Sequence, residues 1–266
     1  MYSGGTTGEF YAMEFDEFQA VARATVEEAQ SYGKPAMVGC GSTYTLGATR
    51  RAAFASEIGA NAIQLVLPYW IELGDDQVVP FFSEVSAAAG GLPLSIYETT
   101  RARKCLRADQ HRAIKDAIPS YLMVKANPGS VGLTPEGCEV LSHFLNVFVD
   151  ETEWPKLGPK GAAGACSWLF YWKPQLSLRL WELLRQQEWE SLERETSPVK
   201  RLLDFAITEF ESKGLTDTAL DRFGAIASGF LRTSLHNRGP YPSATQDDVV
   251  TLRQWCHEHF PEMLKV

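Results

Sequence analysis

Tyr121-Leu122-Met123-Val124-Lys125 is a short run of large, mostly apolar side chains that ends on a lysine. The run is too short for a helix and carries no charge before Lys125, so we expect a β-strand that is covered on both faces. Strands of this kind are typical of parallel sheets, which are packed on both sides. The sequence therefore predicts a parallel sheet, with Lys125 at the carboxyl end of one of its strands.

Strands and helices alternate on both sides of this run at intervals of roughly 30 residues. The expected strands are Ala36–Gly39, Ala62–Leu67, Leu92–Tyr97, Tyr121–Lys125, Val147–Val149 and Ala165–Ser167. The expected helices are Phe15–Tyr32, Thr43–Ile58, Asp75–Ala89, Ala108–Ile118 and one that opens at Thr134-Pro135 and runs to about Phe144. This alternation predicts an α/β fold made of consecutive βα units on a parallel sheet.

The pattern changes at Pro174, after which only helices are expected. Their ranges are Pro174–Gln187, Trp189–Lys213 with a break near Pro198, Thr218–Thr233 and Thr245–Phe260. No linker rich in Gly, Pro or Ser precedes them. We therefore expect a βα portion over residues 1–173, followed over residues 174–266 by the last helix of that portion and a C-terminal helical extension.

Two reactive side chains end neighbouring strands, Tyr97 and Lys125. In an α/β barrel the carboxyl ends of the strands face the active site, where a lysine has an apolar interior behind it and a wet cleft in front. Burial favours the neutral amine, which is nucleophilic towards a carbonyl carbon, and a tyrosine beside it can move protons. The alternative is a strand-end lysine that reaches solvent and a tyrosine that only packs.

Composition excludes several classes of function. The net charge of -8 argues against nucleic acid as the main partner, because phosphate binding needs a basic face. No apolar run approaches the roughly 18 residues of a membrane-spanning helix, and no secretory signal is visible, which points to the cytoplasm. The cysteines lack any CxxC pair and the histidines lack a ligand spacing, so we expect no metal and no disulfide frame.

Short motifs along the chain resemble the dihydrodipicolinate synthase/N-acetylneuraminate lyase family. They are Gly5-Thr6-Thr7-Gly8-Glu9, Pro68-Tyr69, Ile96-Tyr97, Lys125 and Gly161-Ala162-Ala163-Gly164-Ala165-Cys166-Ser167. The first is the most specific, and their order and spacing add to the likeness. The resemblance implies a TIM (β/α)8 barrel with C-terminal helices, and a class I lyase or aldolase that acts on a 2-oxo acid such as pyruvate.

The resemblance also implies roles for individual residues. Lys125 would form the Schiff base and Tyr97 would shuttle protons. Thr6 and Thr7, next to Gly5, would bind the carboxylate of the 2-oxo acid. Three further residues are expected to line the same pocket, namely Cys166, Tyr69 and Trp70. No cofactor is implied; an aldehyde or a hydroxy acid would be the second substrate, and the family's assembly implies a homo-oligomer, a tetramer.

The sequence departs from the family pattern at several places. Trp70 stands where the synthases have a second tyrosine, and the segment after Tyr97, Glu98-Thr99-Thr100-Arg101-Ala102-Arg103, lacks the usual asparagine and proline. The Pro-x-Trp pattern that ends on Trp70 resembles the one in hydratase-aldolases that cleave aromatic 2-oxo acids. Five aromatic residues are candidates to shape an apolar pocket, with ordinary packing as the alternative for most of them: Trp154, Trp168, Phe170, Tyr171 and Trp172. A catalytically silent homologue that binds a keto or sugar acid is the alternative function.

The motif at Gly5 stands unusually close to Met1. In the family, the first strand, the first helix and most of the second strand precede this motif. An eight-unit barrel gives each unit about 31 residues, so a little over one unit is absent before Gly5 in this sequence. The resemblance therefore implies a barrel that lacks its first βα unit, and we expect residues encoded upstream to complete it.

Overall fold

The structure is a computed structural model that describes residues 1–264. The chain divides into two compact units. The first comprises Met1–Val149 and Lys160–Ala163, and the second Asp150–Pro159 and Gly164–Val266. The first unit contains the sheet, and the second contains the C-terminal helices.

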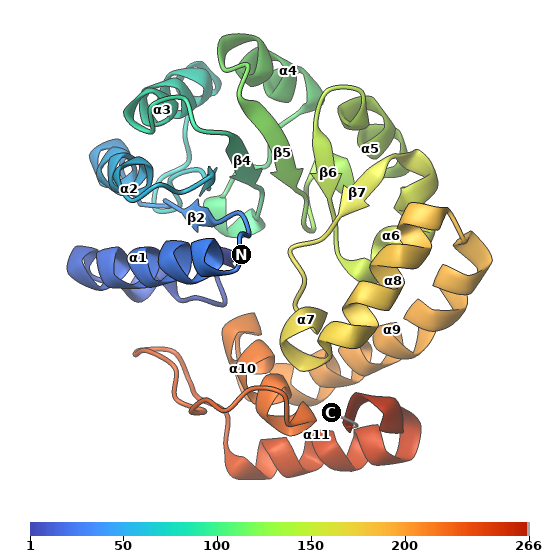
Figure 1. The fold of residues 1–266 in the computed structure, drawn as a ribbon. Helices are drawn as coiled ribbons and strands as arrows, with labels where there is room; N and C mark the ends of the chain where they lie inside the picture. The colour runs from blue at the N-terminus through green and yellow to red at the C-terminus, as the bar shows by residue number, and fades with distance from the viewer. Residues whose placement is uncertain (265–266) are drawn as a thin grey trace. The chain divides into compact units, whose positions relative to one another are not determined.

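The first unit is built on a parallel sheet whose strands follow one another in chain order (Figure 1). The seven strands of the sheet are β1 Tyr2–Ser3, β2 Met37–Gly39, β3 Ala62–Leu65, β4 Leu94–Tyr97, β5 Tyr121–Lys125, β6 Asn146–Phe148 and β7 Ala162–Gly164. Every registered pair from β1 to β6 is parallel. The sheet curls like part of a barrel wall, which confirms the predicted α/β-barrel fold.

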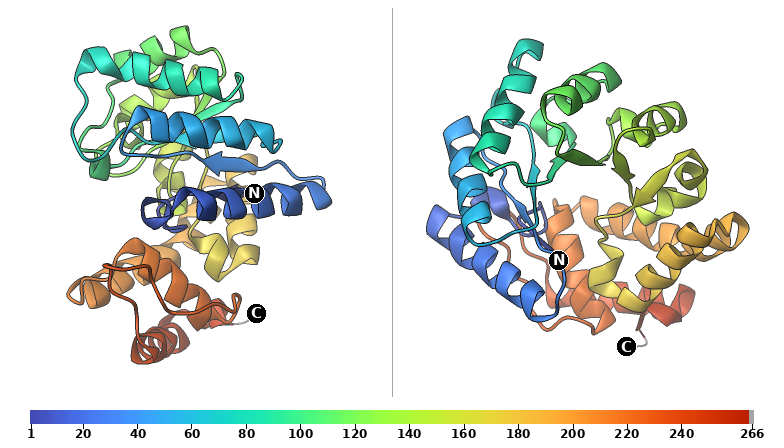
Figure 2. Two further views of the ribbon diagram at one scale, coloured as in Figure 1. Left: turned by 90° about the vertical axis from the view of Figure 1, so that its left-hand side faces the viewer. Right: turned by 45° about the horizontal axis from the view of Figure 1, so that its top comes forward.

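Helices cover the outer side of this curved sheet (Figure 2). They are α1 Phe15–Ser31, α2 Thr45–Glu57, α3 Asp75–Ala88, α4 Ala108–Ala117 and α5 Pro135–Ser142. Strand residues that face them are apolar and fully buried, as at Val38, Ile63 and Val124. This packing removes the outer face of the sheet from water. The expectation that the strand Tyr121–Lys125 is covered on both faces is wrong for part of β5, because Leu122 is 43% exposed and Met123 is only partly buried.

The amphipathic pattern of α1 shows how the sequence specifies this layer. Its buried side chains, Phe18, Ala22, Val26 and Ala29, recur at intervals of three and four residues and therefore share one face of the helix. A capping box between Glu14 and Glu17 satisfies backbone groups at the start of the helix.

The second unit is helical over the residues described. Its helices are α6 Trp154–Leu157, α7 Leu169–Trp172, α8 Pro174–Gln186, α9 Trp189–Glu211, α10 Asp217–Ser228 and α11 Gln246–His259. Phe210 of α9 packs edge-on against Phe223 of α10, with ring centroids 4.8 Å apart. The predicted helical extension is therefore present; the boundary expected at residue 173 stays a prediction.

Three expectations about the elements need correction. β7 lies at Ala162–Gly164 rather than Ala165–Ser167, because the Ser167 hydroxyl accepts a hydrogen bond from Phe170 N at 2.9 Å and so helps to begin α7. α9 runs through Pro198 without a break, since a proline removes one hydrogen bond from a long helix whose buried face remains packed. α10 ends at Ser228, where Gly229 takes a left-handed conformation, instead of continuing to Thr233.

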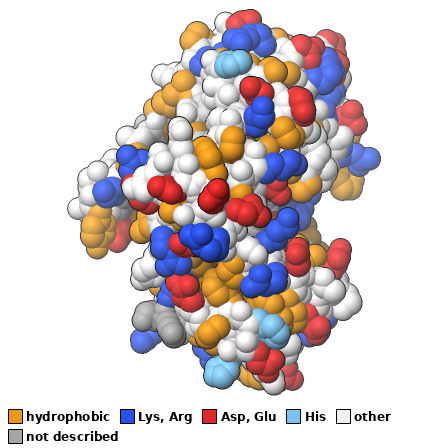
Figure 3. All heavy atoms as spheres, turned by 90° about the vertical axis from the view of Figure 1, so that its right-hand side faces the viewer, with side chains coloured by type: hydrophobic (Ala, Val, Ile, Leu, Met, Phe, Trp, Pro, Cys, Tyr) orange, Lys and Arg blue, Asp and Glu red, His pale blue; other side chains and the backbone are white. Residues whose placement is uncertain are grey.

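Acidic and basic side chains are interspersed on the face drawn in Figure 3, where Lys and Arg lie among Asp and Glu rather than in one continuous area. Within residues 1–264, none of the helices has the length and apolar character needed to cross a membrane.

Candidate functional site

Lys125 and Tyr97 end adjacent strands and lie directly opposite each other in the register of β4 and β5. Lys125 Nζ lies 4.4 Å from the centroid of the Tyr97 ring. Tyr97 is 7% exposed, and its hydroxyl is 3.0 Å from Oγ1 of Thr6, within hydrogen-bond distance. The structure thus brings together three of the residues that the sequence predicted for the site.

A tight turn after β1 places Thr6 and Thr7. Gly4 has a φ of +85°, a left-handed conformation that favours glycine. The turn packs so closely on β2 that a Cβ on Gly39 would meet the Gly4 oxygen at 2.3 Å. Glu9 N donates to Thr6 O at 2.8 Å and closes the turn. Small residues are therefore required here because the backbone of the turn lies directly against the backbone of a strand.

Gly5 is as confined as its neighbour Gly4. A Cβ at Gly5 would lie 2.8 Å from the hydroxyl of Tyr2. That hydroxyl donates to Gln64 Oε1, and Gln64 Nε2 donates to Ser95 Oγ at 2.9 Å. Gln64 lies opposite Ser95 in the register, and Ser95 is two residues before Tyr97, so all three side chains point to the inner face of the sheet.

The polar chain formed by Tyr2, Gln64 and Ser95 was missed in the sequence. Its only local signal was a glutamine and a serine inside strands that otherwise carry apolar residues. Buried polar groups of this kind are stable because they bond to one another. These three hydrogen-bonded side chains lie on the inner face of the sheet, and the Tyr2 hydroxyl among them lies against Gly5 of the turn.

Tyr69 and Trp70 differ in their surroundings. Tyr69 is partly buried and packs edge-on against Phe10, with ring centroids 6.0 Å apart. Trp70 is 76% exposed. An indole with that exposure contributes little to the closed wall of a pocket in this chain, so the role expected for Trp70 stays a prediction.

Cys166 belongs to the second unit, where it is partly exposed. Of the aromatic residues expected near it, Trp154 and Trp172 are buried and each donates its indole N–H to a backbone oxygen, Gly164 O at 3.2 Å and Asp221 O at 3.1 Å. These two residues are structural. Trp168 packs edge-on against Trp172, with ring centroids 5.1 Å apart, and donates to Asp150 Oδ2 at 2.7 Å.

Glu151 is a fully buried acid in the second unit that was not identified in the sequence. Its Oε1 accepts a hydrogen bond from Ser177 Oγ at 3.3 Å, and Ser177 Oγ lies 3.0 Å from Ser167 Oγ. Its Oε2 has no hydrogen-bond partner among the described residues. Burial, helped by the charge of Asp150, raises the pKa of Glu151 to about 8.

This raised pKa makes stability depend on pH. Between about pH 5 and pH 8 the native protein holds a proton on Glu151, whereas the unfolded chain has already lost it, so stability falls as the pH rises. Over that window the loss is about 3 kcal/mol. We expect Glu151→Gln to remove most of this slope, as measured by urea unfolding at several pH values. Glu153→Gln, in the same turn, is the matched control, and parallel pH profiles for wild type and Glu151→Gln would contradict the assignment.

The arrangement of Lys125, Tyr97 and Thr6 suits one kind of chemistry. An amine, a phenol and an alcohol converge at the carboxyl ends of parallel strands. No carboxylate forms an ion pair with Lys125 within the part of the chain that the structure describes. Such a set can form an imine with a carbonyl compound and transfer protons beside it.

Comparisons with known proteins agree with this picture. The sequence pattern of the family described as the dihydrodipicolinate synthetase family matches residues 1–241. A curated relative, an uncharacterised DapA-like lyase of Pyrococcus abyssi, is 26% identical over 222 residues, which cover 77% of this chain and 71% of the relative. A probable 5-dehydro-4-deoxyglucarate dehydratase of Streptomyces coelicolor is 29% identical over 206 residues, which cover 74% of this chain and 61% of the relative.

Solved structures show the same fold. One of them is YagE from E. coli K12, a prophage protein of the dihydrodipicolinic acid synthase family that was crystallised with pyruvate. It superposes with a TM-score of 0.85 at 17% sequence identity, over 97% of this chain and 85% of that one. At this identity the likeness establishes the fold and leaves the reaction open.

Proposed function

Because the chain belongs to the dihydrodipicolinate synthetase family, we propose that it is a class I lyase or aldolase that forms a Schiff base between Lys125 and a 2-oxo acid such as pyruvate. The observation that carries the proposal is that Tyr97 contacts both other residues of the set. Lys125 Nζ lies 4.4 Å from the centroid of the Tyr97 ring, and Thr6 Oγ1 lies 3.0 Å from the Tyr97 hydroxyl. Relatives of the chain include a lyase and a dehydratase, which agrees with this reaction class.

In the proposed reaction, the amine of Lys125 adds to C2 of the 2-oxo acid, and uptake of a proton with loss of water gives an iminium ion. The iminium withdraws electrons from C3, so that a C3 proton leaves and an enamine forms. The enamine then attacks an aldehyde, or, in the reverse direction, a bond at C3 breaks to release one. Water is consumed again when the imine is hydrolysed and Lys125 is regenerated.

Tyr97 and Thr6 have separate tasks in this scheme. The Tyr97 hydroxyl would move protons to and from the reacting atoms, because the ring that carries it lies beside the amine. The Thr6 hydroxyl fixes the orientation of that phenol, and the N–H groups and hydroxyls of the turn at Thr6 and Thr7 would hold the substrate carboxylate. The roles expected for Tyr69 and for Cys166 in substrate binding stay predictions from the sequence.

Trapping with borohydride tests the proposal directly. The protein is incubated with pyruvate, reduced and digested, and the peptides are examined by mass spectrometry. We expect a reduced adduct on the peptide that contains Lys125 and on no other lysine. A folded protein that yields no adduct would contradict the proposal and favour the alternative, a homologue that binds a keto or sugar acid without reacting.

A second assay needs no knowledge of the aldehyde partner. An enamine takes up deuterium from D2O when it returns to the iminium, so turnover as far as the enamine exchanges the methyl protons of pyruvate. Loss of the methyl signal in proton NMR measures this rate. An aromatic second substrate is the finer proposal, and it rests on the family resemblance at Trp70 rather than on the exposed position of that side chain. A cytoplasmic homo-tetramer stays a prediction from the sequence.

A further inference from the structure

A buried acid stands directly behind the proposed site. Glu98 follows Tyr97 in the chain, so its side chain points to the opposite side of the strand end from the phenol. It is 3% exposed, and its carboxylate accepts hydrogen bonds from Leu106 N at 2.6 Å and from Ser130 Oγ. Its Oε2 also lies 3.3 Å from His111 Nε2.

His111 links this acid to the start of β5. The imidazole is fully buried, and its Nδ1 lies 2.8 Å from the hydroxyl of Tyr121. Burial, together with the charge of Glu98, raises the pKa of Tyr121, so the phenol keeps its proton and donates it to Nδ1. Nε2 then carries the imidazole proton and lies 3.3 Å from the carboxylate, although it forms no hydrogen bond of normal geometry with the described residues.

The backbone of Glu98 connects the two residues of the proposed site. Glu98 N donates to Lys125 O at 3.0 Å, and Glu98 O accepts from Asn127 Nδ2 at 2.7 Å. Tyr97 precedes Glu98 in the chain, and Asn127 follows Lys125 by two residues. The backbone of Glu98 thus holds the end of β4 against the end of β5, and a displacement of Glu98 would shift the phenol relative to the amine.

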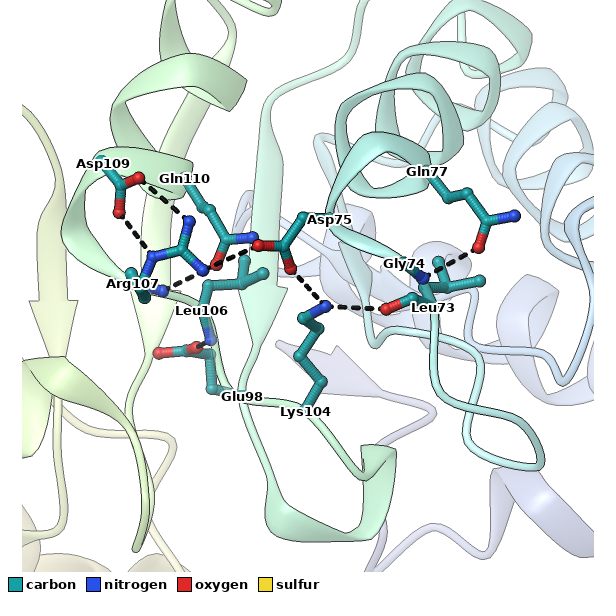
Figure 4. Close-up of polar contacts among 10 residues, drawn as sticks. All are labelled: Leu73, Gly74, Asp75, Gln77, Glu98, Lys104, Leu106, Arg107, Asp109 and Gln110. Atoms are coloured by element: carbon teal, nitrogen blue, oxygen red, sulfur yellow. Dashed lines mark hydrogen bonds and ion pairs between the residues drawn. The ribbon is translucent and has the colours of Figure 1, made fainter.

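The loop that reaches Glu98 is also held from its far side (Figure 4). Lys104 Nζ pairs with Asp75 Oδ1 at 2.6 Å and donates to Leu73 O at 2.7 Å, and Arg107 pairs with the other oxygen of Asp75 at 2.9 Å. Asp75 and Arg107 are exposed and Lys104 is largely buried, whereas Glu98 holds the loop from the interior through Leu106. Two anchors of different kinds thus act on one loop.

We propose that Glu98 is a positioning residue that aligns Tyr97 with Lys125, by tying the end of β4 to the loops after β4 and β5 and to His111. The inference rests on the proposed function. The carboxylate receives donors from two segments, at Leu106 and Ser130, and a buried carboxylate is held in place because loss of either donor is costly. Alignment matters because a misplacement of about 1 Å at a reacting group slows an enzyme about 10²-fold.

Shortening the side chain tests this role. In Glu98→Asp the charge remains, but the carboxylate is one methylene too short to reach Leu106 N and Ser130 Oγ with the strand in place. We expect exchange of pyruvate methyl protons at saturating pyruvate to fall by about 10- to 100-fold. The fraction of Lys125 trapped by borohydride, and the pyruvate concentration that half-saturates it, should stay within about 3-fold, because imine formation tolerates misalignment of Tyr97 better than proton transfer does.

Glu98→Gln is the rescuing variant. It keeps the length and one acceptor for Leu106 N, and its amide can donate to Ser130 Oγ, so exchange should stay within about 5-fold of wild type. If Glu98→Asp fails to fold, Ser130→Ala replaces it, with an expected loss of about 5-fold in exchange. Asp75→Asn, which weakens the surface anchor of the same loop, should leave exchange unchanged.

The outcomes separate the two proposals. A wild-type protein that forms no adduct overturns the proposed function and the positioning role with it. A wild-type adduct together with wild-type exchange in Glu98→Asp overturns the positioning role alone. A loss in Glu98→Asp that Glu98→Gln and Asp75→Asn share equally would also overturn it, because the effect would then be one of general loosening.

Discussion

Replacing Lys125 by alanine is expected to abolish both the borohydride-trapped adduct and the exchange of pyruvate methyl protons. Lys125 is the residue opposite Tyr97 in the register of β4 and β5, so the variant has no amine at that position to form the imine. Because the imine is the intermediate of every step in the proposed reaction, we expect no exchange above the uncatalysed rate, a loss of at least about 10⁴-fold. The measurement is proton NMR in D2O beside peptide mass spectrometry.

The fold of the variant has to be verified by its urea-unfolding curve. Lys160→Ala is the matched control. Lys160 is an exposed lysine outside the sheet interior, and its Nζ forms an ion pair with Glu139 Oε2 at a distance of 3.0 Å. It should behave as the wild type does. Retained turnover in Lys125→Ala would refute the role of Lys125 and remove the basis of the proposed reaction.

Tyr97→Phe is expected to separate imine formation from proton transfer. The phenylalanine keeps the ring beside Lys125 Nζ, so pyruvate should still be trapped on Lys125. It lacks the hydroxyl that contacts Thr6, so exchange should be slower by about 10²- to 10⁴-fold, the usual contribution of a general acid or base. Single-turnover trapping and exchange on one preparation give both values.

Thr6→Val gives an independent measure of the same contact. It retains the Tyr97 hydroxyl but removes its partner at 3.0 Å, so we expect a loss smaller than that of Tyr97→Phe. Tyr32→Phe, at a tyrosine that is 71% exposed, is the control for the chemical change itself. Exchange at the wild-type rate in Tyr97→Phe would assign proton transfer to another group.

Local patterns were sufficient to predict most of the first unit. The strand Tyr121–Lys125 has the predicted bounds, and α3 begins at Asp75 as expected and ends one residue early. The two-residue strand β1 was missed because Tyr2–Ser3 is too short to show any periodicity. It becomes a strand only through its pairing with Met37 and Val38, which a sequence does not display.

The site was also predicted only in part, because short motifs are visible in a sequence but contacts between distant residues are not. Lys125, Tyr97 and Thr6 were identified from motifs, and the structure brings them together. Glu98 was noticed only as a departure from the family pattern. Its partners Leu106, His111 and Ser130 lie 8 to 32 residues away in the chain, and only the folded chain brings them together.

The order of the strands has a consequence for how the first unit is made. Each strand from β2 to β6 pairs with the strand that was synthesised just before it, over separations of roughly 20 to 35 residues. Such a sheet has no strand that must wait for a distant partner, so it can grow one unit at a time as the chain leaves the ribosome. The strand that carries Lys125 can therefore pair with the strand that carries Tyr97 before the helices from α8 onward have been translated.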